Sequence, residues 1–209
     1  MASPLSRREL VERCLATGAL FLAPALPLGV AEPLLADEAA HAPTPHNELG
    51  PFYKRKAPKT AVLAPEGAPG VPLTVGGVVL DTRGERLEGA VLELWHASSA
   101  GLYDNEGYLY RGVVEAGAKG AYEFRSVLPG HYVGRVCQHI HYRVTAPGHK
   151  PLVTQLYFAT DPAFDGDPDR NFRKDPLLTS RELVRPVALA ADGSTVSARV
   201  RFEICLERA

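Results

Sequence analysis

The chain has 209 residues, 45% of them hydrophobic, and a formal net charge of −1. This length suits one ordinary domain with a leader or a tail, and the apolar fraction is enough for a sizeable core. Because basic residues are not in excess, the composition does not indicate nucleic-acid binding, and the 19 glycines and 18 prolines disfavour a fold built from long helices.

Residues 1–36 have the pattern of a twin-arginine-type export signal. Ser-Arg-Arg at positions 6–8 precedes a short apolar run that two prolines interrupt. We expect cleavage after Ala31 or after Ala36, and the run is too short and too broken to make a stable membrane span. The sequence therefore predicts an exported protein, periplasmic or extracellular. The alternative is an N-terminal helix that stays on the protein.

Residues 37–71 are expected to form an extended N-terminal arm. Its first part is polar and contains proline, and its last part is a connector rich in Pro and Gly. Between them, ELGPFYKRKAP at 48–58 is a compact apolar and aromatic patch. We expect Phe52 and Tyr53 to pack the arm onto the body and to line a pocket that binds substrate.

Residues 72–209 are predicted to form one all-β domain. Seven to eight short strands separated by turn signals, with no confident helix, indicate an antiparallel β-sandwich with long loops. The charged run at 165–175 is expected to be a solvated loop that shapes the rim of a pocket. The segments with a strand pattern are 72–81, 89–97, 121–124, 131–137, 139–146, 152–159, 182–190 and 195–207.

A His-x-His pair lies in PGHYVGRVCQHIHYRV, residues 129–144. On a strand, His139 and His141 point to the same face, so both imidazoles can reach one metal ion, although a plain polar strand face fits equally well. Tyr132 precedes His139 by seven residues, and Tyr103 follows the strand at 89–97. Two phenolates would neutralise two of the three charges of Fe(III), so a set of two tyrosines and two histidines fits ferric iron better than zinc.

Four short motifs together resemble the intradiol ring-cleavage dioxygenases, the non-haem Fe(III) enzymes of catechol and protocatechuate breakdown. TPHNELGPFY at 44–53 is also similar to the entry segment of that family, and the chain looks like its small exported type. The resemblance extends from about Thr44 to Asp161. The four motifs are Gly-Leu-Tyr-Asp at 101–104, Pro-Gly-His-Tyr at 129–132, His-Ile-His at 139–141 and Thr-Gln-Leu-Tyr-Phe at 154–158.

The resemblance implies a site and a reaction. Catechol-type aromatic diols would be cleaved with O2 to muconate-type diacids. Tyr132 matches the tyrosinate that leaves the metal when substrate binds and that takes a substrate proton. Gln155 would lie beside the substrate and O2, while Tyr157 is expected in the core. The implied ligands of non-haem Fe(III) are Tyr103, Tyr132, His139 and His141.

One position departs from the family pattern. The family has an arginine three residues before His-Ile-His, next to bound substrate, whereas this chain has Val136 there and Arg135 one residue earlier. Arg135 is the candidate for that catalytic and substrate-binding role. Because a shift of one residue along a strand turns the side chain to the other face, Arg135 reaches the pocket only if a bulge absorbs the extra residue.

Several alternatives stay open. A non-catalytic β-sandwich binding domain would share most of the strand pattern, and a zinc hydrolase could use His139 and His141, although no third ligand is evident. The sequence does not identify which catechol is the substrate. Protocatechuate would need a cation to bind its carboxylate, and the candidates are Arg135, Lys54 and Arg55.

The state of the two cysteines outside the leader also has two possible interpretations. Cys137 and Cys205 could form a disulfide in an exported protein, or they could be two separate buried thiols. The pattern is also compatible with an oligomer.

Overall fold

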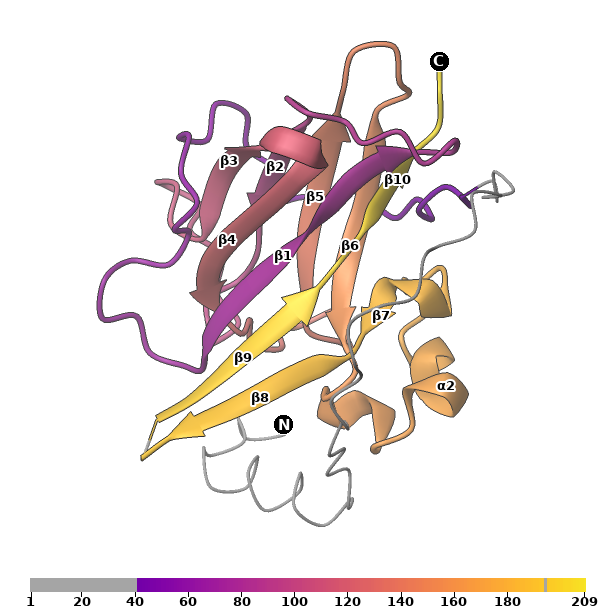
Figure 1. The fold of residues 1–209 in the computed structure, drawn as a ribbon. Coiled ribbons are helices and arrows are strands. Elements are labelled where there is room, and N and C mark those ends of the chain that lie inside the picture. Colours follow the sequence, from indigo (N-terminus) through magenta and orange to yellow (C-terminus); the bar gives the residue numbers. More distant parts are fainter. Residues whose placement is uncertain (1–40, 194) are drawn as a thin grey trace, which may run out of the picture. The chain divides into compact units, whose positions relative to one another are not determined.

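The computed structural model describes residues 41–193 and 195–209, so the predicted export signal and the first residues of the arm lie outside the described residues. Ten strands in these ranges form two five-stranded sheets (Figure 1). No helix in the described part of the chain is long and apolar enough to cross a membrane. The helices are short: η1 (Ala118–Gly120), η2 (Pro162–Phe164), α2 (Pro168–Asn171), η3 (Phe172–Lys174) and η4 (Arg181–Leu183).

The first sheet is built around its longest strand, β1 (Pro72–Asp81). β4 (Ala121–Val127) pairs with β1 in the antiparallel direction. β9 (Thr195–Arg201) and β10 (Ile204–Leu206) pair with successive parts of β1 in the parallel direction, and β8 (Val187–Asp192) pairs with β9. The last strands of the chain therefore hold its first strand in place.

The second sheet has the order β3-β2-β5-β6-β7. Its pairings are antiparallel except for the short parallel contact between β6 and β7. The bounds are Arg111–Glu115 for β3, Val91–Trp95 for β2, His139–Thr145 for β5, Leu152–Phe158 for β6 and Val184–Arg185 for β7.

Strand β5 has two different faces because successive residues alternate. Ile140, Tyr142 and Val144 are fully buried in the core between the two sheets. His139 and His141 point the other way, yet they are only 2% and 1% exposed. The second sheet therefore has another covered surface opposite the core, which we call the site face.

The strand register aligns the residues of the site face in rows. Trp95 of β2 lies opposite His141, and His141 lies opposite Gln155 of β6. In the next row, His139 lies opposite Tyr157. Directly opposite residues on neighbouring antiparallel strands bring their side chains close together, so the sheet itself places two imidazoles beside an amide and a phenol.

Residues 41–71 run over the body without forming a helix or a strand. Backbone hydrogen bonds tie this arm to both sheets. The N–H of Asn47 donates to the carbonyl of Val153 (2.9 Å), and the N–H of Leu63 donates to that of Arg125 (2.9 Å). The arm is thus part of the packed body and helps to cover the site face.

The predicted all-β sandwich is confirmed, with three differences of detail, of which the first is the additional strand β3. Its sheets are mixed, because β1–β9, β1–β10 and β6–β7 are parallel. Parallel pairing joins segments that are distant in sequence and leaves no local turn signal. Residues 131–137 were expected as a strand but form a loop, since the chain turns at Val133–Gly134 and Gly134 takes a positive φ of 91°.

The two cysteines of the body are both buried and both free. Cys137 lies in the loop before β5, whereas Cys205 lies in β10 and packs against Val78 and Leu80 of the first sheet. The disulfide alternative is therefore wrong, and the alternative of two separate buried thiols describes the structure.

Candidate metal centre

Four rings from three segments meet on the site face. His139 and His141 come from β5, Tyr132 from the loop at 129–138, and Tyr103 from the loop after β2. The centroid distances are 4.8 Å for His139–His141, 5.6 Å for His139–Tyr132, 5.4 Å for Tyr132–Tyr103 and 6.5 Å for Tyr103–His141. Each ring thus adjoins two of the others, and the four form a closed cycle.

The first imidazole is oriented by the backbone. Nδ1 of His139 lies 2.9 Å from the carbonyl oxygen of Cys137, which can only accept, so Nδ1 carries the proton. Nε2 then presents its lone pair to the cluster, where the hydroxyl of Tyr132 lies at 3.2 Å and Nη1 of Arg135 at 3.1 Å. Burial, and secondarily Arg135, lowers the pKa of His139 to about 3. The ring is therefore neutral, as a metal ligand must be.

Three buried polar atoms of the cluster have no hydrogen-bond partner: both ring nitrogens of His141 and the hydroxyl of Tyr103. Buried polar groups are nearly always satisfied, and leaving one unpaired costs about 1–3 kcal/mol. Burial, and the neighbouring His139, hold the pKa of His141 well below its usual range. The neutral imidazole of His141 and the phenol of Tyr103 are neighbouring rings with unpartnered polar atoms, which a bound metal ion would satisfy.

The phenol of Tyr103 needs a cation in order to ionise. Burial, and then the neighbouring Tyr132, raise the pKa of Tyr103 far above its ordinary value. An anionic phenolate in such a place requires compensating positive charge. Within the described ranges no group of three or more His, Cys, Asp or Glu side chains is placed to hold a metal. A metal in this cluster would therefore bind phenol oxygens as well as imidazole nitrogens, which suits ferric iron.

Aromatic rings wall the cluster. Phe52 of the arm stacks on Tyr103 at 4.0 Å, and Trp95 of β2 stacks on His141 at 4.9 Å. The arm also approaches His141 directly, since a Cβ atom built on Gly50 would lie 3.1 Å from Cε1 of that ring. These contacts fix the ring planes and keep water away from the donor atoms.

Tyr53 anchors the arm and does not present a free hydroxyl to the cluster. Its ring lies 5.0 Å from that of Trp95, and its hydroxyl donates to Oε1 of Glu93 at 2.8 Å. Arg143 donates to the other carboxylate oxygen of Glu93. Phe52 therefore lies at the cluster, whereas Tyr53 holds the arm that carries it.

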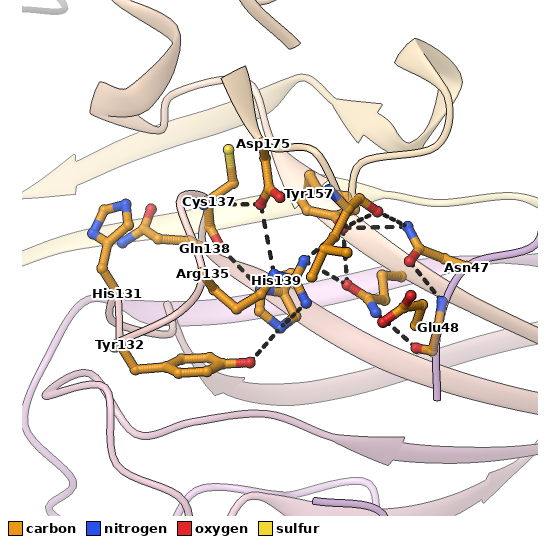
Figure 2. Close-up of polar contacts among 12 residues, drawn as sticks. Asn47, Glu48, His131, Tyr132, Arg135, Cys137, Gln138, His139, Tyr157 and Asp175 are labelled. Carbon is orange, nitrogen blue, oxygen red and sulfur yellow. Dashed lines mark hydrogen bonds and ion pairs between the residues drawn. The ribbon is translucent and has the colours of Figure 1, made fainter. Parts of the chain in front are cut away.

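Arg135 reaches the cluster, although the loop has one residue more than the family pattern. The chain turns after Tyr132 instead of continuing as a strand, and the N–H of Arg135 donates to the carbonyl of Tyr132 (3.2 Å). This turn, in place of a strand bulge, absorbs the extra residue. Figure 2 shows the Arg135 side chain beside His139, while Val136 is exposed.

Gln155 and Tyr157 bind the far side of the Arg135 guanidinium. Nη2 of Arg135 donates to Oε1 of Gln155 (2.9 Å) and to the hydroxyl of Tyr157 (2.7 Å). The amide nitrogen of Gln155 donates to the carbonyl of Glu48 in the arm (2.7 Å), and that of Asn47 donates to the Tyr157 hydroxyl (3.2 Å). Arm, loop and strand are thus joined in one polar network.

Comparison with known proteins shows which family the chain belongs to. A sequence model of the dioxygenase family matches residues 49–208, well over half of the chain. The chain belongs to the intradiol dioxygenase family.

Relatives and solved structures of this family agree in sequence and fold. Chlorocatechol 1,2-dioxygenase of Rhodococcus opacus is 35% identical over 176 residues, which cover 70% of this chain and 66% of the relative. Hydroxyquinol 1,2-dioxygenase of Corynebacterium glutamicum is 30% identical, with 81% and 65% covered. The chain spans slightly less than two thirds of the length of these two relatives.

A solved structure matches over its whole length. It is the dioxygenase domain of a fusion of a dioxygenase with a carbohydrate-binding protein from Streptomyces sp. SirexAA-E, with a TM-score of 0.68 and 34% identity. The match covers 80% of this chain and 100% of that domain. Catechol 1,2-dioxygenase of Acinetobacter sp. ADP1 superimposes with a TM-score of 0.67 at 27% identity, over 79% of this chain and 63% of that one.

The structure of this dioxygenase-family chain brings together most of the residues singled out from the sequence. The four predicted ligands, Phe52, Arg135 and Gln155 lie at the cluster, and Tyr53 lies behind it. Tyr157 is buried in the core as expected, but its hydroxyl also binds Arg135, which sequence reasoning missed. It missed two further contributors, Asn47 and Asp175, the second of which accepts from the N–H of Cys137. Tyr157 could have been found, because it lies two residues after Gln155 and so shares its strand face.

Proposed function

We propose that this protein is a non-haem Fe(III)-dependent intradiol dioxygenase that cleaves catechol-type aromatic diols with O2 to muconate-type diacids. The observation that carries the proposal is the closed cycle of two phenols and two imidazoles, in which the Tyr103 hydroxyl and both His141 nitrogens are buried and unpartnered. Tyr103, Tyr132, His139 and His141 would hold the metal. When bound, ferric iron supplies a Lewis acid for both catechol oxygens and makes the ring reactive towards O2.

The protein side of the reaction is proton transfer and orientation. The hydroxyl of Tyr132 comes from a loop rather than from the sheet and lies 3.2 Å from Nε2 of His139. As a phenolate, its oxygen accepts the proton that a catechol hydroxyl releases. Arg135 and Gln155 orient the substrate, and Phe52 shields the cluster from water.

The preferred substrate is a catechol without a carboxylate. The ammonium group of Lys54 donates to the carbonyls of Asn105, Glu106 and Gly107, which uses all three of its N–H bonds. Nη2 of Arg135 is engaged by Gln155 and Tyr157, whereas its Nη1 is directed at the cluster. Of the three cations that could bind the carboxylate of protocatechuate, Lys54 is therefore already engaged. Catechol, chlorocatechol and hydroxyquinol, the substrates named for the relatives, carry no carboxylate.

A visible spectrum combined with oxygen uptake tests this function. Iron-loaded protein is expected to be burgundy because of a tyrosinate-to-iron absorption band. Adding catechol should shift the band, with O2 consumed in equimolar amount to substrate. Protein that stays colourless after iron addition would overturn the proposal. Stoichiometric zinc without colour would favour the hydrolase alternative, and a folded protein without metal would favour the binding-domain alternative.

We also propose that the protein is exported to the periplasm or beyond the cell. The support is the paired arginines, Arg7 and Arg8, ahead of a short apolar run. Cell fractionation should recover wild-type protein outside the cytoplasm. The variant with both arginines changed to lysine should accumulate inside, and equal export of the two proteins would contradict the proposal.

A further inference from the structure

The first part of the loop between Tyr132 and His139 is open to solvent. Val133 is fully exposed, Val136 is also exposed, and Gly134 has a positive φ of 91°. Nevertheless this loop carries Arg135, whose side chain is only 6% exposed and lies against the ligand cluster. The loop is anchored at its other end, where Cys137 is buried in the core and the side-chain amide of Gln138 donates to the carbonyl of Pro129 (2.8 Å).

Two buried aspartates hold the end of this loop. They come from the connection between β6 and β7, residues 159–183, and each is 1% exposed. Oδ2 of Asp175 accepts from the N–H of Cys137 at 3.1 Å, and Oδ2 of Asp161 accepts from the N–H of Gln138 at 2.6 Å. Two consecutive amides of the loop are therefore fixed by two carboxylates from one distant segment.

Asp175 also faces the guanidinium itself. Its Oδ2 lies 3.6 Å from Nε of Arg135, which is an ion-pair distance without a hydrogen bond, while its Oδ1 accepts from the N–H of Leu177 at 2.9 Å. Burying a carboxylate is unfavourable unless it is paired and hydrogen-bonded, and here both conditions are met. Asp161 has no comparable contact with Arg135, since its other oxygen binds His131 and the N–H of Ala163.

The guanidinium of Arg135 is thus held from two sides. Asp175 lies at its Nε edge, and the Tyr157 hydroxyl binds Nη2 at 2.7 Å (Figure 2). Because a guanidinium is a rigid planar fork, the hydrogen bonds to Nη2 and the carboxylate charge beside Nε together set the direction of Nη1. Nη1 points at His139, 3.1 Å from Nε2.

We propose that Asp175 is a positioning residue, which keeps Arg135 directed at the substrate site by hydrogen-bonding to its loop and by placing a carboxylate charge beside its guanidinium. This inference rests on the proposed function, in which Arg135 orients a catechol. It explains how a loop with an extra residue still delivers an arginine to the cluster: the support comes from residues 159–183 rather than from a strand.

A double-mutant cycle tests the inference. The proteins are wild type, Asp175→Asn, Arg135→Gln and the double variant, all loaded with iron. Catechol dissociation constants are measured without oxygen, from the shift of the tyrosinate band, so that no turnover occurs. Loss of such a supporting residue is expected to weaken binding by about ten-fold or more. If Asp175 acts through Arg135, the double variant should bind no more weakly than Arg135→Gln alone.

Asp169→Asn is the matched control. Asp169 lies in the same connection, but its side chain is exposed and pairs with Arg181, so catechol affinity should not change. Iron content and thermal unfolding are measured for every variant. In metal-free protein, amide exchange at Cys137 should be faster in Asp175→Asn than in wild type. If Asp175→Asn does not fold, Asp175→Glu replaces it in the same cycle, because it keeps the carboxylate but displaces it from the N–H of Cys137 and from Arg135.

The outcomes separate the two proposals. Wild-type protein that shows no catechol-dependent shift overturns the proposed function, and the positioning role with it. Wild-type protein that binds catechol, combined with additive effects of the two substitutions, overturns the positioning role alone.

Discussion

Arg111 shows how a single buried residue joins distant parts of the site. It lies on β3 and is only 2% exposed. Nη1 donates to the carbonyl of Phe52 in the arm at 2.6 Å, and Nη2 donates to the carbonyl of Asp104 in the Tyr103 loop at 3.1 Å. Its guanidinium carbon also lies 5.8 Å from the centre of the Tyr103 ring. One cation therefore holds together the two segments that place Phe52 against Tyr103.

Arg111→Met should loosen both segments. Two buried carbonyls would each lose a charge-assisted donor, so the free energy of unfolding should fall by about 2–4 kcal/mol. Arg111→Lys should restore only part of this, because an ammonium group lacks the fork that reaches both carbonyls. Urea unfolding of the metal-free proteins measures the change. Arg199→Met removes only an exposed pair with Glu123 and is the control, and an equal loss in both Met variants would contradict the role.

The grouping of the four proposed ligands could be predicted from the sequence and its resemblance to the family, whereas their supports could not. His139 and His141 alternate on a strand, so their common side follows from geometry alone. The placement of Arg135 does not, because it depends on the carboxylate of Asp175, which lies far along the chain in the connection between β6 and β7. Asp175 itself stands in a run of charged residues, most of which are exposed. No local pattern distinguishes the buried aspartate from its neighbours.

At the scale of elements, two loops meet through a glycine. Gly101 precedes the Tyr103 loop and has a φ of +76°. A Cβ atom built there would lie 2.0 Å from the carbonyl oxygen of His131 and 3.4 Å from Cβ of Tyr132. The loop that carries one phenol therefore rests against the loop that carries the other, and only a hydrogen fits between them.

Gly101→Ala should push these loops apart. Backbone strain and overlap with the His131 carbonyl act together, so stability should fall by about 2–4 kcal/mol and iron should bind less than stoichiometrically. Gly89→Ala is the matched control, because Gly89 has nearly the same φ, +75°, with nothing within 4 Å of its Cβ position. The free energy of unfolding of that variant should fall by only about 1 kcal/mol, because alanine is strained at a positive φ. Thermal unfolding and iron analysis compare the two, and equal effects would rule out the steric explanation.

The strands themselves were largely predictable, because their apolar residues alternate and Pro and Gly mark the turns. Strand β3 could not be predicted, because its sequence, RGVVE, is short and does not alternate apolar and polar residues. The parallel contacts of β1 were not predictable either. Residues 73–76 pair with residues 198–201, and such a distant partner is chosen by the packing of the whole sandwich rather than by a turn.

At the scale of the whole molecule, the site is assembled from four separate segments. The arm, the Tyr103 loop, the Tyr132 loop and the connection between β6 and β7 all meet over one face of the second sheet. None of these segments is a strand, and each is fixed by hydrogen bonds to at least one other. The rigid sandwich provides the two histidines, and the irregular segments provide the phenols and the arginine, so the site depends on the complete fold.

The end of the chain is tied to β1 by a buried carboxylate. Asp81 is the last residue of β1 and has no solvent exposure. It accepts from Nε of Arg208 at 2.7 Å and from the N–H groups of Arg83 and Glu85, each at 2.9 Å. Burial by itself would raise the pKa of Asp81, but the bonds to Arg208 and to the backbone outweigh it and lower the pKa to about 2.

Asp81 should therefore make the fold more stable at neutral pH than in acid. Its folded pKa lies below its ordinary value of 3.8, so its contribution is complete above about pH 4 and disappears as the pH falls towards 2. Asp81→Asn removes this contribution, and the difference in unfolding free energy from wild type should shrink across that window. Urea midpoints between pH 7 and pH 2.5 measure it. Arg208→Met removes the partner of Asp81, so its difference in unfolding free energy from wild type should also shrink as the pH falls. Lys150→Gln breaks a neighbouring exposed pair with Glu207, and its difference from wild type should not show this pH dependence. A difference between Asp81→Asn and wild type that stays constant with pH would show that the ion pair with Arg208 does not stabilise the fold.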